Sequence, residues 1–172
     1  MGYVAPRPLA ESDDVATFQC RSSEQTTWLQ RHAKQSAASK STKVFVVTQH
    51  DDHHVVAYYA WTMAQVQRGE APPRLNKGGG RYQQPVALLA RLGVDEGHEG
   101  QGLGAALLAD VIARLLVVGE EIGCRGLLIH AESEQARDFY LHLLPELQAS
   151  PTDPLHLVLL VKDAIQTLRQ YL

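Results

Sequence analysis

Cysteine is scarce in this chain of 172 residues, and its two cysteines, Cys20 and Cys124, lie far apart. Their spacing excludes a paired metal or redox motif and favours a reducing compartment. No apolar run approaches the roughly 20 residues that a membrane span needs. The first ten residues also lack the basic-then-apolar pattern of a secretory signal. We therefore expect a cytoplasmic protein that does not act at a membrane.

Charged residues are moderate in number, at 20% of the chain, whereas hydrophobic residues make up 45%. That balance excludes an intrinsically disordered protein. The length suits one domain with a sizeable core, and neither a repeat nor a low-complexity segment divides it. We expect a single domain over residues 1–172.

The formal net charge of −3 is unevenly distributed along the chain. Residues 21–91 hold ten basic and four acidic side chains, a net charge of +6, whereas residues 92–172 hold five basic and twelve acidic ones, a net charge of −7. This pattern fits either an ordinary solvated surface or a basic face for a polyanion such as nucleic acid. The residues expected at such a nucleic-acid-binding face are Arg31, Lys34, Lys77, Arg81 and Arg91. Arg31 and Lys34 are three apart, which predicts one helical face.

Hydrophobic periodicity predicts alternating strands and helices. The expected helices are 24–35 (capped by Ser22 or Ser23), 104–119, 134–143 (capped by Ser133) and 163–172, and the expected strands are 44–48, 55–62, 86–94, 126–131 and 155–161. The first two of these strands should form an antiparallel hairpin, and residues 65–84, with two prolines and three consecutive glycines, a long loop. This order predicts an α/β fold with a mixed central β-sheet and helices on both faces.

The helix predicted over residues 104–119 is unusually apolar. Its strong polar positions are Asp110 and Arg114, four residues apart, which predicts one narrow exposed stripe and burial of the rest. Such an apolar helix leaves room for a homodimer.

A glycine-rich turn follows the apolar strand 86–94 and leads directly into that helix. Glycines at positions 97, 100, 102 and 104 let the backbone approach a ligand, and the N-terminus of the helix favours an anion. The turn fits a phosphate or pyrophosphate cradle, and equally a tight turn alone. A nucleotide-hydrolysing P-loop is excluded because no Lys-Ser/Thr follows, and the spacing does not match G-x-G-x-x-G.

The segment Glu99-Gly100-Gln101-Gly102-Leu103-Gly104 resembles the acetyl-CoA turn of the GNAT superfamily of N-acetyltransferases, which reads Gln/Arg-x-x-Gly-x-Gly/Ala. Glu99 departs from that pattern and places an acid beside the expected pyrophosphate. Over about residues 4–162 the chain is similar to one branch of the superfamily, the tRNA-acetylating toxins of bacterial toxin–antitoxin pairs. The supporting motifs are Phe18-Gln19-Cys20, Val56-Ala57-Tyr58-Tyr59, Ala90-Arg91-Leu92-Gly93-Val94-Asp95 and Ala136-Arg137-Asp138-Phe139-Tyr140. Leu143-Leu144-Pro145 and the final helix depart from the branch.

The resemblance implies the GNAT fold, acetyl-CoA as acetyl donor and a set of site residues. The backbone of Leu92 and Val94 would pair with the pantetheine arm, and a backbone N–H near Val94 would stabilise the oxyanion. The other implied donor-binding positions are Glu99, Gly100, Gly102, Leu103, Gly104 and Ser133, of which Gly100, Gly102 and Gly104 would hold the pyrophosphate. Tyr140, which on its own reads as a packing residue, would return a proton to the departing thiolate.

Candidates for a general base are weak in this sequence. His130 is expected as a satisfied core histidine, and Glu132 and Glu134 as acids near a helix start. An α-amine with a pKa of about 7.7–8.0 is largely neutral at cytosolic pH, whereas a lysine at about 10.4 is not. The absence of a base therefore fits aminoacyl-tRNA. The run from His50 to His54 is interpreted as a solvated turn, and no metal is expected.

We therefore predict a toxin that acetylates the α-amine of aminoacyl-tRNA and blocks translation, with a ribbon-helix-helix antitoxin as partner. One alternative is an acetyltransferase for a small amine or a protein N-terminus. The other is a non-catalytic acyl-CoA-binding or DNA-binding partner module, which Glu99 would favour.

Overall fold

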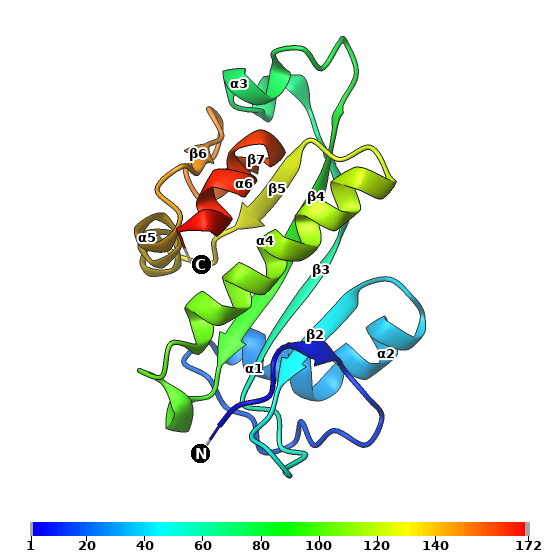
Figure 1. The fold of residues 1–172 in the computed structure, drawn as a ribbon, viewed down its shortest axis with the longest axis vertical. Coiled ribbons are helices and arrows are strands. Elements are labelled where there is room, and N and C mark those ends of the chain that lie inside the picture. The colour runs from blue at the N-terminus through cyan, green and yellow to red at the C-terminus, as the bar shows by residue number, and fades with distance from the viewer. Residues whose placement is uncertain (1, 171–172) are drawn as a thin grey trace. The chain divides into compact units, whose positions relative to one another are not determined.

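The computed structural model describes residues 2–170 and divides the chain into two compact units. Unit 1 is Met1–Thr62 with Ala90–Asp110, and unit 2 is Met63–Leu89 with Val111–Leu172. Strands β3 (Ala57–Val66) and β4 (Gln84–Val94) pass through both units (Figure 1).

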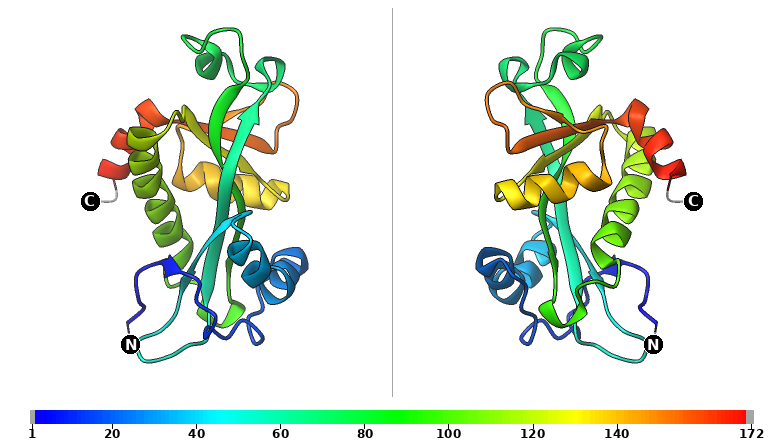
Figure 2. Two further views of the ribbon diagram at one scale, coloured as in Figure 1. Left: turned by 90° about the vertical axis from the view of Figure 1, so that its right-hand side faces the viewer. Right: turned by 90° about the vertical axis from the view of Figure 1, so that its left-hand side faces the viewer.

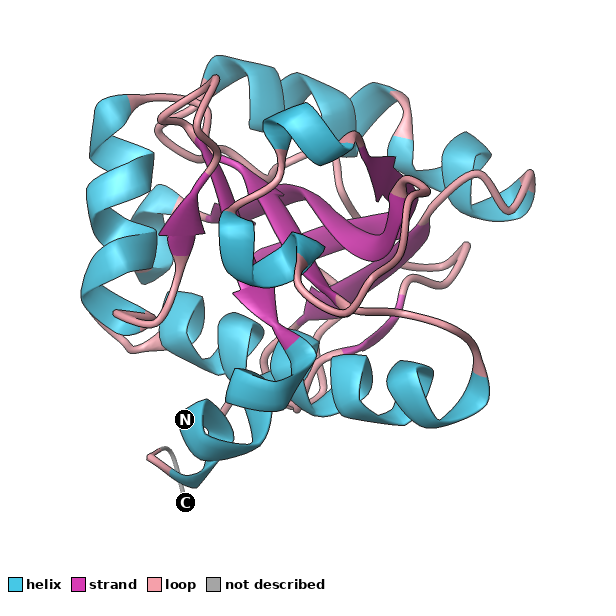
Figure 3. Cartoon of the chain, turned by 90° about the horizontal axis from the view of Figure 1, so that it is seen from above, coloured by secondary structure: helices cyan, strands magenta, loops and turns pink. Residues whose placement is uncertain are grey.

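Each unit contains both helices and strands, and in Figure 3 the strands are bordered by helices. Unit 1 adds β1 (Arg7–Pro8), α1 (Ser23–Arg31), α2 (Ala33–Ala38), β2 (Lys43–Val47), the 3₁₀ turn η2 (Glu96–His98) and the start of α4 (Leu103–Glu121). Unit 2 adds η1 (Arg68–Glu70), α3 (Pro73–Asn76), the rest of α4, β5 (Gly126–His130), α5 (Glu134–Leu143), β6 (Gln148–Ala149), β7 (His156–Leu160) and α6 (Val161–Arg169).

The strands form a mixed seven-stranded sheet in the order β1-β2-β3-β4-β5-β7-β6. In unit 1, β2 pairs antiparallel with β1 and with β3, where Phe45 lies opposite Tyr59. In unit 2, β4 pairs with β5 in parallel, and β5 pairs with β7 antiparallel. Within unit 2, α4 and α6 lie on one face of the strands and α5 on the other (Figure 2). The expected mixed sheet with helices on both faces is confirmed.

Aromatic packing organises the core of unit 1. Phe18 contacts Tyr58 edge to face with ring centroids 5.5 Å apart, and Trp28 stacks on the same ring at 6.0 Å. Leu29 of α1 and Val46 of β2 are fully buried in this cluster. Burial of this apolar area fixes α1 against the strands that precede the glycine turn.

Aliphatic side chains organise the core of unit 2. Leu75 of α3 packs with Val86 of β4, Leu128 of β5 and Val158 of β7. The segment 65–84, expected as a loop, therefore carries a short helix, because burial of Leu75 fixes it to the sheet. Arg125 further holds this segment by donating to the carbonyl oxygen of Leu75 at 2.8 Å.

Several expected elements differ from those observed. The single helix expected over residues 24–35 is two helices, since His32 interrupts it between α1 and α2. The short strands β1 and β6 had no sequence signal and arise from pairing with β2 and β7.

The exposed stripe expected on α4 is also different. Asp110 and Arg114 are half-buried, and Asp110 accepts a hydrogen bond from the Tyr59 hydroxyl at 2.6 Å. Ala106, Ala113 and Val117 are exposed instead. Apolar side chains therefore occupy the solvent-facing side of this helix, because Tyr59 binds one of its polar groups. Among residues 2–170, no helix combines the length and apolar character of a membrane span.

Candidate acyl-donor and proton-transfer sites

Strand β4 is followed in unit 1 by a turn that several hydrogen bonds hold in place. The Asp95 carboxylate accepts from the backbone N–H of Gly97 at 2.9 Å through Oδ1 and from that of Gln19 at 3.0 Å through Oδ2. The N–H of Glu96 returns a bond to the Gln19 carbonyl at 2.9 Å. One carboxylate thus fixes both the start of the turn and the segment that precedes α1.

The two glycines before α4 have the backbone conformation that only glycine adopts easily. Gly100 has φ +76° and Gly102 has φ +79°, and a Cβ at either position would have no heavy atom within 4 Å. The side of the turn that a Cβ would cover is therefore open. Open backbone of this kind admits close approach of a ligand.

Helix α4 begins immediately after these glycines. Its first helical hydrogen bond runs from the N–H of Ala106 to the carbonyl of Gly102 at 3.0 Å. The N–H groups of Leu103 and Gly104 precede that bond, at the positive end of the helix dipole. Open glycine backbone next to the N-terminus of a helix favours an anion, so a pyrophosphate would fit here.

Leu92 and Val94 occupy the end of β4 and are half-buried. Gly93 between them is buried, and a Cβ there would lie 3.2–3.3 Å from Tyr58, Cys20 and Phe18. The strand end is thus packed tightly against the unit 1 core, which makes it a rigid support for the turn.

The acid at the head of the turn has a cationic partner that the sequence did not reveal. Arg21 donates from Nε to Oε1 of Glu99 and from Nη2 to Oε2, both at 2.9 Å. Sequence reasoning missed Arg21 because it lies 78 positions away along the chain.

Tyr140 lies in unit 2 near the C-terminal end of α5 and is only 7% exposed. Burial, together with the nearby Glu132 carboxylate, raises the pKa of its hydroxyl. A raised pKa keeps the phenol protonated at neutral pH, the form that a proton donor requires. Its role as proton donor stays a prediction.

Ser133 is confirmed as the N-cap of α5. Its hydroxyl accepts from the N–H of Ala136 at 3.1 Å, and the residue is exposed. Its contribution to donor binding stays a prediction.

His130 differs from the expected core histidine, since it is exposed at the end of β5. Its ring stacks on that of His156 with centroids 4.0 Å apart. Although the residue is exposed, partial desolvation of its ring and the neighbouring His156 lower the pKa of His130, which favours its neutral form. Sequence reasoning missed this histidine pair because cross-strand pairing of β5 with β7 brings it together.

The basic residues of unit 1 are arranged differently from the expected single helical face. Arg31 ends α1 and is exposed, whereas Lys34 lies beyond the break at His32 and donates to the carbonyl of Glu11 at 2.8 Å. The prediction that both share one helical face is wrong, because the helix does not continue through His32.

Arg91 is partly neutralised by its surroundings. It donates to Glu24 at 2.9 Å, and its guanidinium carbon lies 5.5 Å from the Trp28 ring centre. These residues line a cavity of about 370 Å³ beside α1. Lys77 and Arg81 of unit 2 are exposed between α3 and β4.

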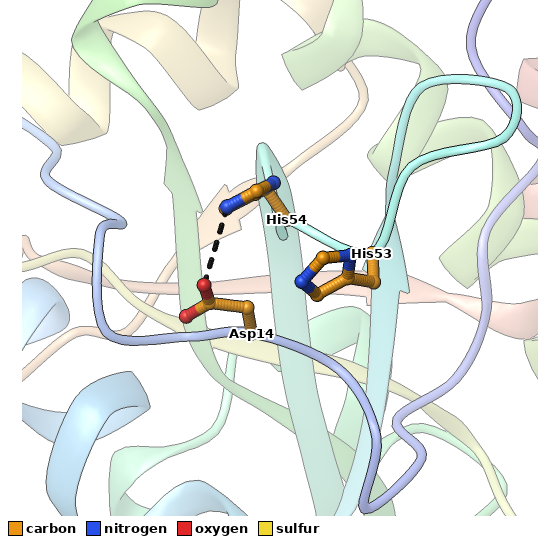
Figure 4. A group of neighbouring side chains, drawn as sticks. All are labelled: Asp14, His53 and His54. Atoms are coloured by element: carbon orange, nitrogen blue, oxygen red, sulfur yellow. Dashed lines mark ion pairs between the residues drawn. The ribbon is translucent and has the colours of Figure 1, made fainter.

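Side chains of the histidine-rich turn lie closer to other possible metal ligands than the sequence indicated. Asp14, His53 and His54 offer ligand atoms within 4.8 Å of one another (Figure 4). His54, however, already places Nδ1 2.7 Å from Asp52 and Nε2 3.2 Å from Asp14. The Asp52 contact raises the pKa of His54, which favours the charged form that pairs with Asp52 and Asp14. The cluster reads as an ion-pair network.

Comparison with known proteins agrees with this geometry. A family model described as "Acetyltransferase (GNAT) family" matches residues 10–144. A tRNA-acetylating toxin of Mycobacterium tuberculosis is 39% identical over 163 residues, which cover 95% of each chain. A probable toxin TacT of Sinorhizobium fredii is 24% identical over 152 residues, covering 85% of this chain and 84% of that protein.

Solved structures share the fold. A tyrosine-to-phenylalanine variant of KacT superposes with a TM-score of 0.87 at 23% identity, covering 96% of this chain and 99% of that one. AtaT complexed with acetyl-methionyl-tRNAfMet superposes with a TM-score of 0.86 at 21% identity, covering 98% and 99%. The family match, the 39% identical relative and the shared fold lead to one conclusion: the chain belongs to the GNAT acetyltransferase family.

Proposed function

We propose that this protein transfers the acetyl group of acetyl-CoA to the α-amine of aminoacyl-tRNA and thereby acts as a toxin that arrests translation. The observation that carries the proposal is the 39% identity, over 95% of both chains, to a protein named as a tRNA-acetylating toxin. The fold shared with AtaT, whose solved complex contains acetyl-methionyl-tRNAfMet, supports the same substrate class.

The donor site that we propose is the backbone of unit 1. The open glycines Gly100 and Gly102, with the N–H groups of Leu103 and Gly104, hold the pyrophosphate of acetyl-CoA. The strand end at Leu92 and Val94 pairs with the pantetheine arm. A backbone N–H near Val94 donates to the carbonyl oxygen of the thioester as it becomes an oxyanion.

The chemistry needs one nucleophile and one proton donor. The neutral α-amine attacks the thioester carbon, a tetrahedral oxyanion forms, and its collapse breaks the carbon–sulfur bond. Tyr140 gives its proton to the leaving thiolate, and the proton that the amine loses restores the phenol through solvent. The raised pKa of Tyr140 keeps the hydroxyl protonated until the thiolate appears, and it also makes the phenol a weaker acid than an ordinary tyrosine.

A dedicated base is unnecessary for this substrate. An α-amine has a pKa of about 7.7–8.0, so a large fraction is neutral at cytosolic pH. Blocking that amine prevents peptide-bond formation.

We further propose a cytoplasmic location, where charged tRNA and acetyl-CoA occur, and a ribbon-helix-helix antitoxin as partner. The solved structure of AtaT bound to the C-terminus of the antitoxin AtaR supports the presence of an antitoxin partner.

We propose a single acetyltransferase domain that includes both units, since β3 and β4 pass through each. A homodimer would cover the exposed apolar side chains of Val117 and Ile122, which are 61% and 60% exposed.

The experiment that tests the function compares three acceptors with labelled acetyl-CoA: total aminoacyl-tRNA, the same tRNA after deacylation, and a panel of free amines and peptides. We expect label on aminoacyl-tRNA alone, recovered as N-acetyl-amino acid after mild alkaline hydrolysis. Label on free amines or peptide N-termini with none on tRNA overturns the proposal, as does acetyl-CoA binding without transfer to any acceptor.

A further inference from the structure

The glycine turn carries only acidic charge at neutral pH, apart from one histidine. Asp95, Glu96 and Glu99 lie within its first five residues, and neither lysine nor arginine occurs between positions 92 and 104. A pyrophosphate brings further negative charge to this place. The backbone N–H groups alone must then bind an anion against three carboxylates.

Arg21 brings a cation to the turn from a distant segment. It bonds both carboxylate oxygens of Glu99 at 2.9 Å, through Nε and Nη2. A guanidinium has five N–H donors in a fixed planar fork, so this bidentate contact uses two of them. The Arg21 side chain is 82% exposed.

The backbone that carries Arg21 is fixed to the turn. Gln19 exchanges hydrogen bonds with Asp95 and Glu96 at 3.0 and 2.9 Å. The N–H of Cys20 donates to the Thr26 hydroxyl at 3.0 Å, which ties the next residue to α1. The backbone next to Arg21 is therefore held beside the turn.

We propose that Arg21 is an acyl-donor-binding residue: Glu99 orients its guanidinium, and the remaining N–H donors bind the pyrophosphate of acetyl-CoA. This inference rests on the proposed function. Arg21 would thus supply from outside the turn the positive charge that the turn itself lacks. Guanidinium geometry matches phosphate oxygens and makes charge-assisted hydrogen bonds to them.

The test measures acetyl-CoA affinity by calorimetry for the wild type, Arg21→Gln, Glu99→Gln and the double variant. Arg21→Gln should weaken affinity about 10- to 100-fold, the range for hydrogen bonds to a charged group. Glu99→Gln should stay within about threefold of the wild type, because losing the orienting partner and losing a repulsive charge oppose each other. Lys40→Gln, which removes an exposed positive charge from unit 1 outside the turn, is the matched control and should leave affinity unchanged.

The double variant decides between direct binding and simple neutralisation of Glu99. We expect it to regain only the part of the loss that repulsion from Glu99 causes and to stay weaker than the wild type, since the donor contact is still missing. Recovery of wild-type affinity would show that Arg21 only cancels the Glu99 charge and would overturn the inference.

A second acetyl donor distinguishes failure of this inference from failure of the proposed function. Acetyl-pantetheine lacks the pyrophosphate, so Arg21→Gln and wild type should use it at equal rates. An equal loss with both donors would mean that Arg21 acts on the fold of the turn and not on the phosphate. Wild type that fails to bind acetyl-CoA would refute the proposed function, whereas normal binding by Arg21→Gln refutes this inference alone.

Discussion

The glycine turn of unit 1 and the tyrosine of unit 2 are built in opposite ways. The turn presents backbone N–H groups on an open surface, and its side chains, such as Asp95, serve to anchor it. Tyr140 presents one side-chain hydroxyl from a buried position, where burial raises its pKa. The turn acts through the positions of its main-chain groups, whereas Tyr140 acts through one side-chain hydroxyl in a buried position.

This difference determines what each site tolerates. A backbone site accepts unusual side chains, including Glu99, provided that the φ angles and the anchors persist. A side-chain site depends on one oxygen atom. Our central claim follows from this contrast: the turn binds the acetyl donor, and Tyr140 contributes to the chemical step without contributing to donor binding.

The largest effect should come from closing the open side of the turn. Gly102→Val puts a branched side chain at φ +79°, where L-residues are strained, and into the space that the pyrophosphate needs. Acetyl-CoA binding should fall below detection by calorimetry while the far-UV circular dichroism spectrum is unchanged.

Gly123→Val is the matched control for that change. Gly123 also has open space around a Cβ, but its φ lies outside the left-handed region, and it follows the opposite end of α4. It should bind acetyl-CoA normally. Normal affinity in Gly102→Val would remove the turn from the donor site.

A smaller effect should appear when tRNA contacts are removed and the donor site is left alone. If Arg31 and Lys34 each contact a phosphate, reversing both charges should reduce the slope of log affinity against log salt by about 2. Arg91→Gln should act in the same direction, and acetyl-CoA affinity should be unaffected in all variants. A salt titration of tRNA binding checks this, and a flat wild-type response would contradict the basic face and favour a small-amine substrate.

A loss of turn anchoring should be milder still. Asp95→Ala removes the acceptor for Gly97 and Gln19, and loss of such a capping carboxylate costs about 1 kcal/mol of folding free energy. Urea unfolding should show this decrease, with acetyl-CoA affinity reduced several-fold. Glu96→Ala, which removes an exposed acid one position later, should leave the free energy of unfolding unchanged. Equal stability of Asp95→Ala and wild type would show that the anchor is dispensable.

The smallest expected effect is a pH dependence of the unfolding free energy that involves neither the glycine turn nor Tyr140. Contact with Asp52 raises the pKa of His54, so the charged histidine stabilises the folded state below its unfolded pKa of about 6.5. This stabilisation should disappear as the pH rises through the higher folded pKa. The difference in unfolding free energy between wild type and His54→Asn should therefore shrink as the pH rises from below about 6.5 through the higher folded pKa. A constant difference would contradict the ion pair.

Local signals were sufficient to predict some elements to the residue. Helix α5 occupies Glu134–Leu143 as expected, because the Ser133 cap and the amphipathic pattern both lie in adjacent sequence. The glycine turn was also recognisable, since its conformation depends on glycine itself.

Features that depend on distant contacts were not predictable. The pair of Arg21 with Glu99 joins residues 78 positions apart, and the half-burial of Asp110 depends on the Tyr59 hydroxyl from β3. The break at His32 separates residues that periodicity alone would continue as one helix. In the first two cases tertiary contacts determine a feature to which single-residue propensities contribute little.

The measurement that tests the central claim most directly is a paired determination for Tyr140→Phe of acetyl-CoA affinity and of turnover with aminoacyl-tRNA. Phenylalanine keeps the ring that packs in unit 2 and removes only the hydroxyl. We predict affinity within about twofold of wild type and turnover reduced about 10²–10⁴-fold, the usual contribution of a positioned proton donor. Turnover equal to wild type would show that Tyr140 is a packing residue, and a parallel loss of donor affinity would show that binding and chemistry are not divided between the two sites.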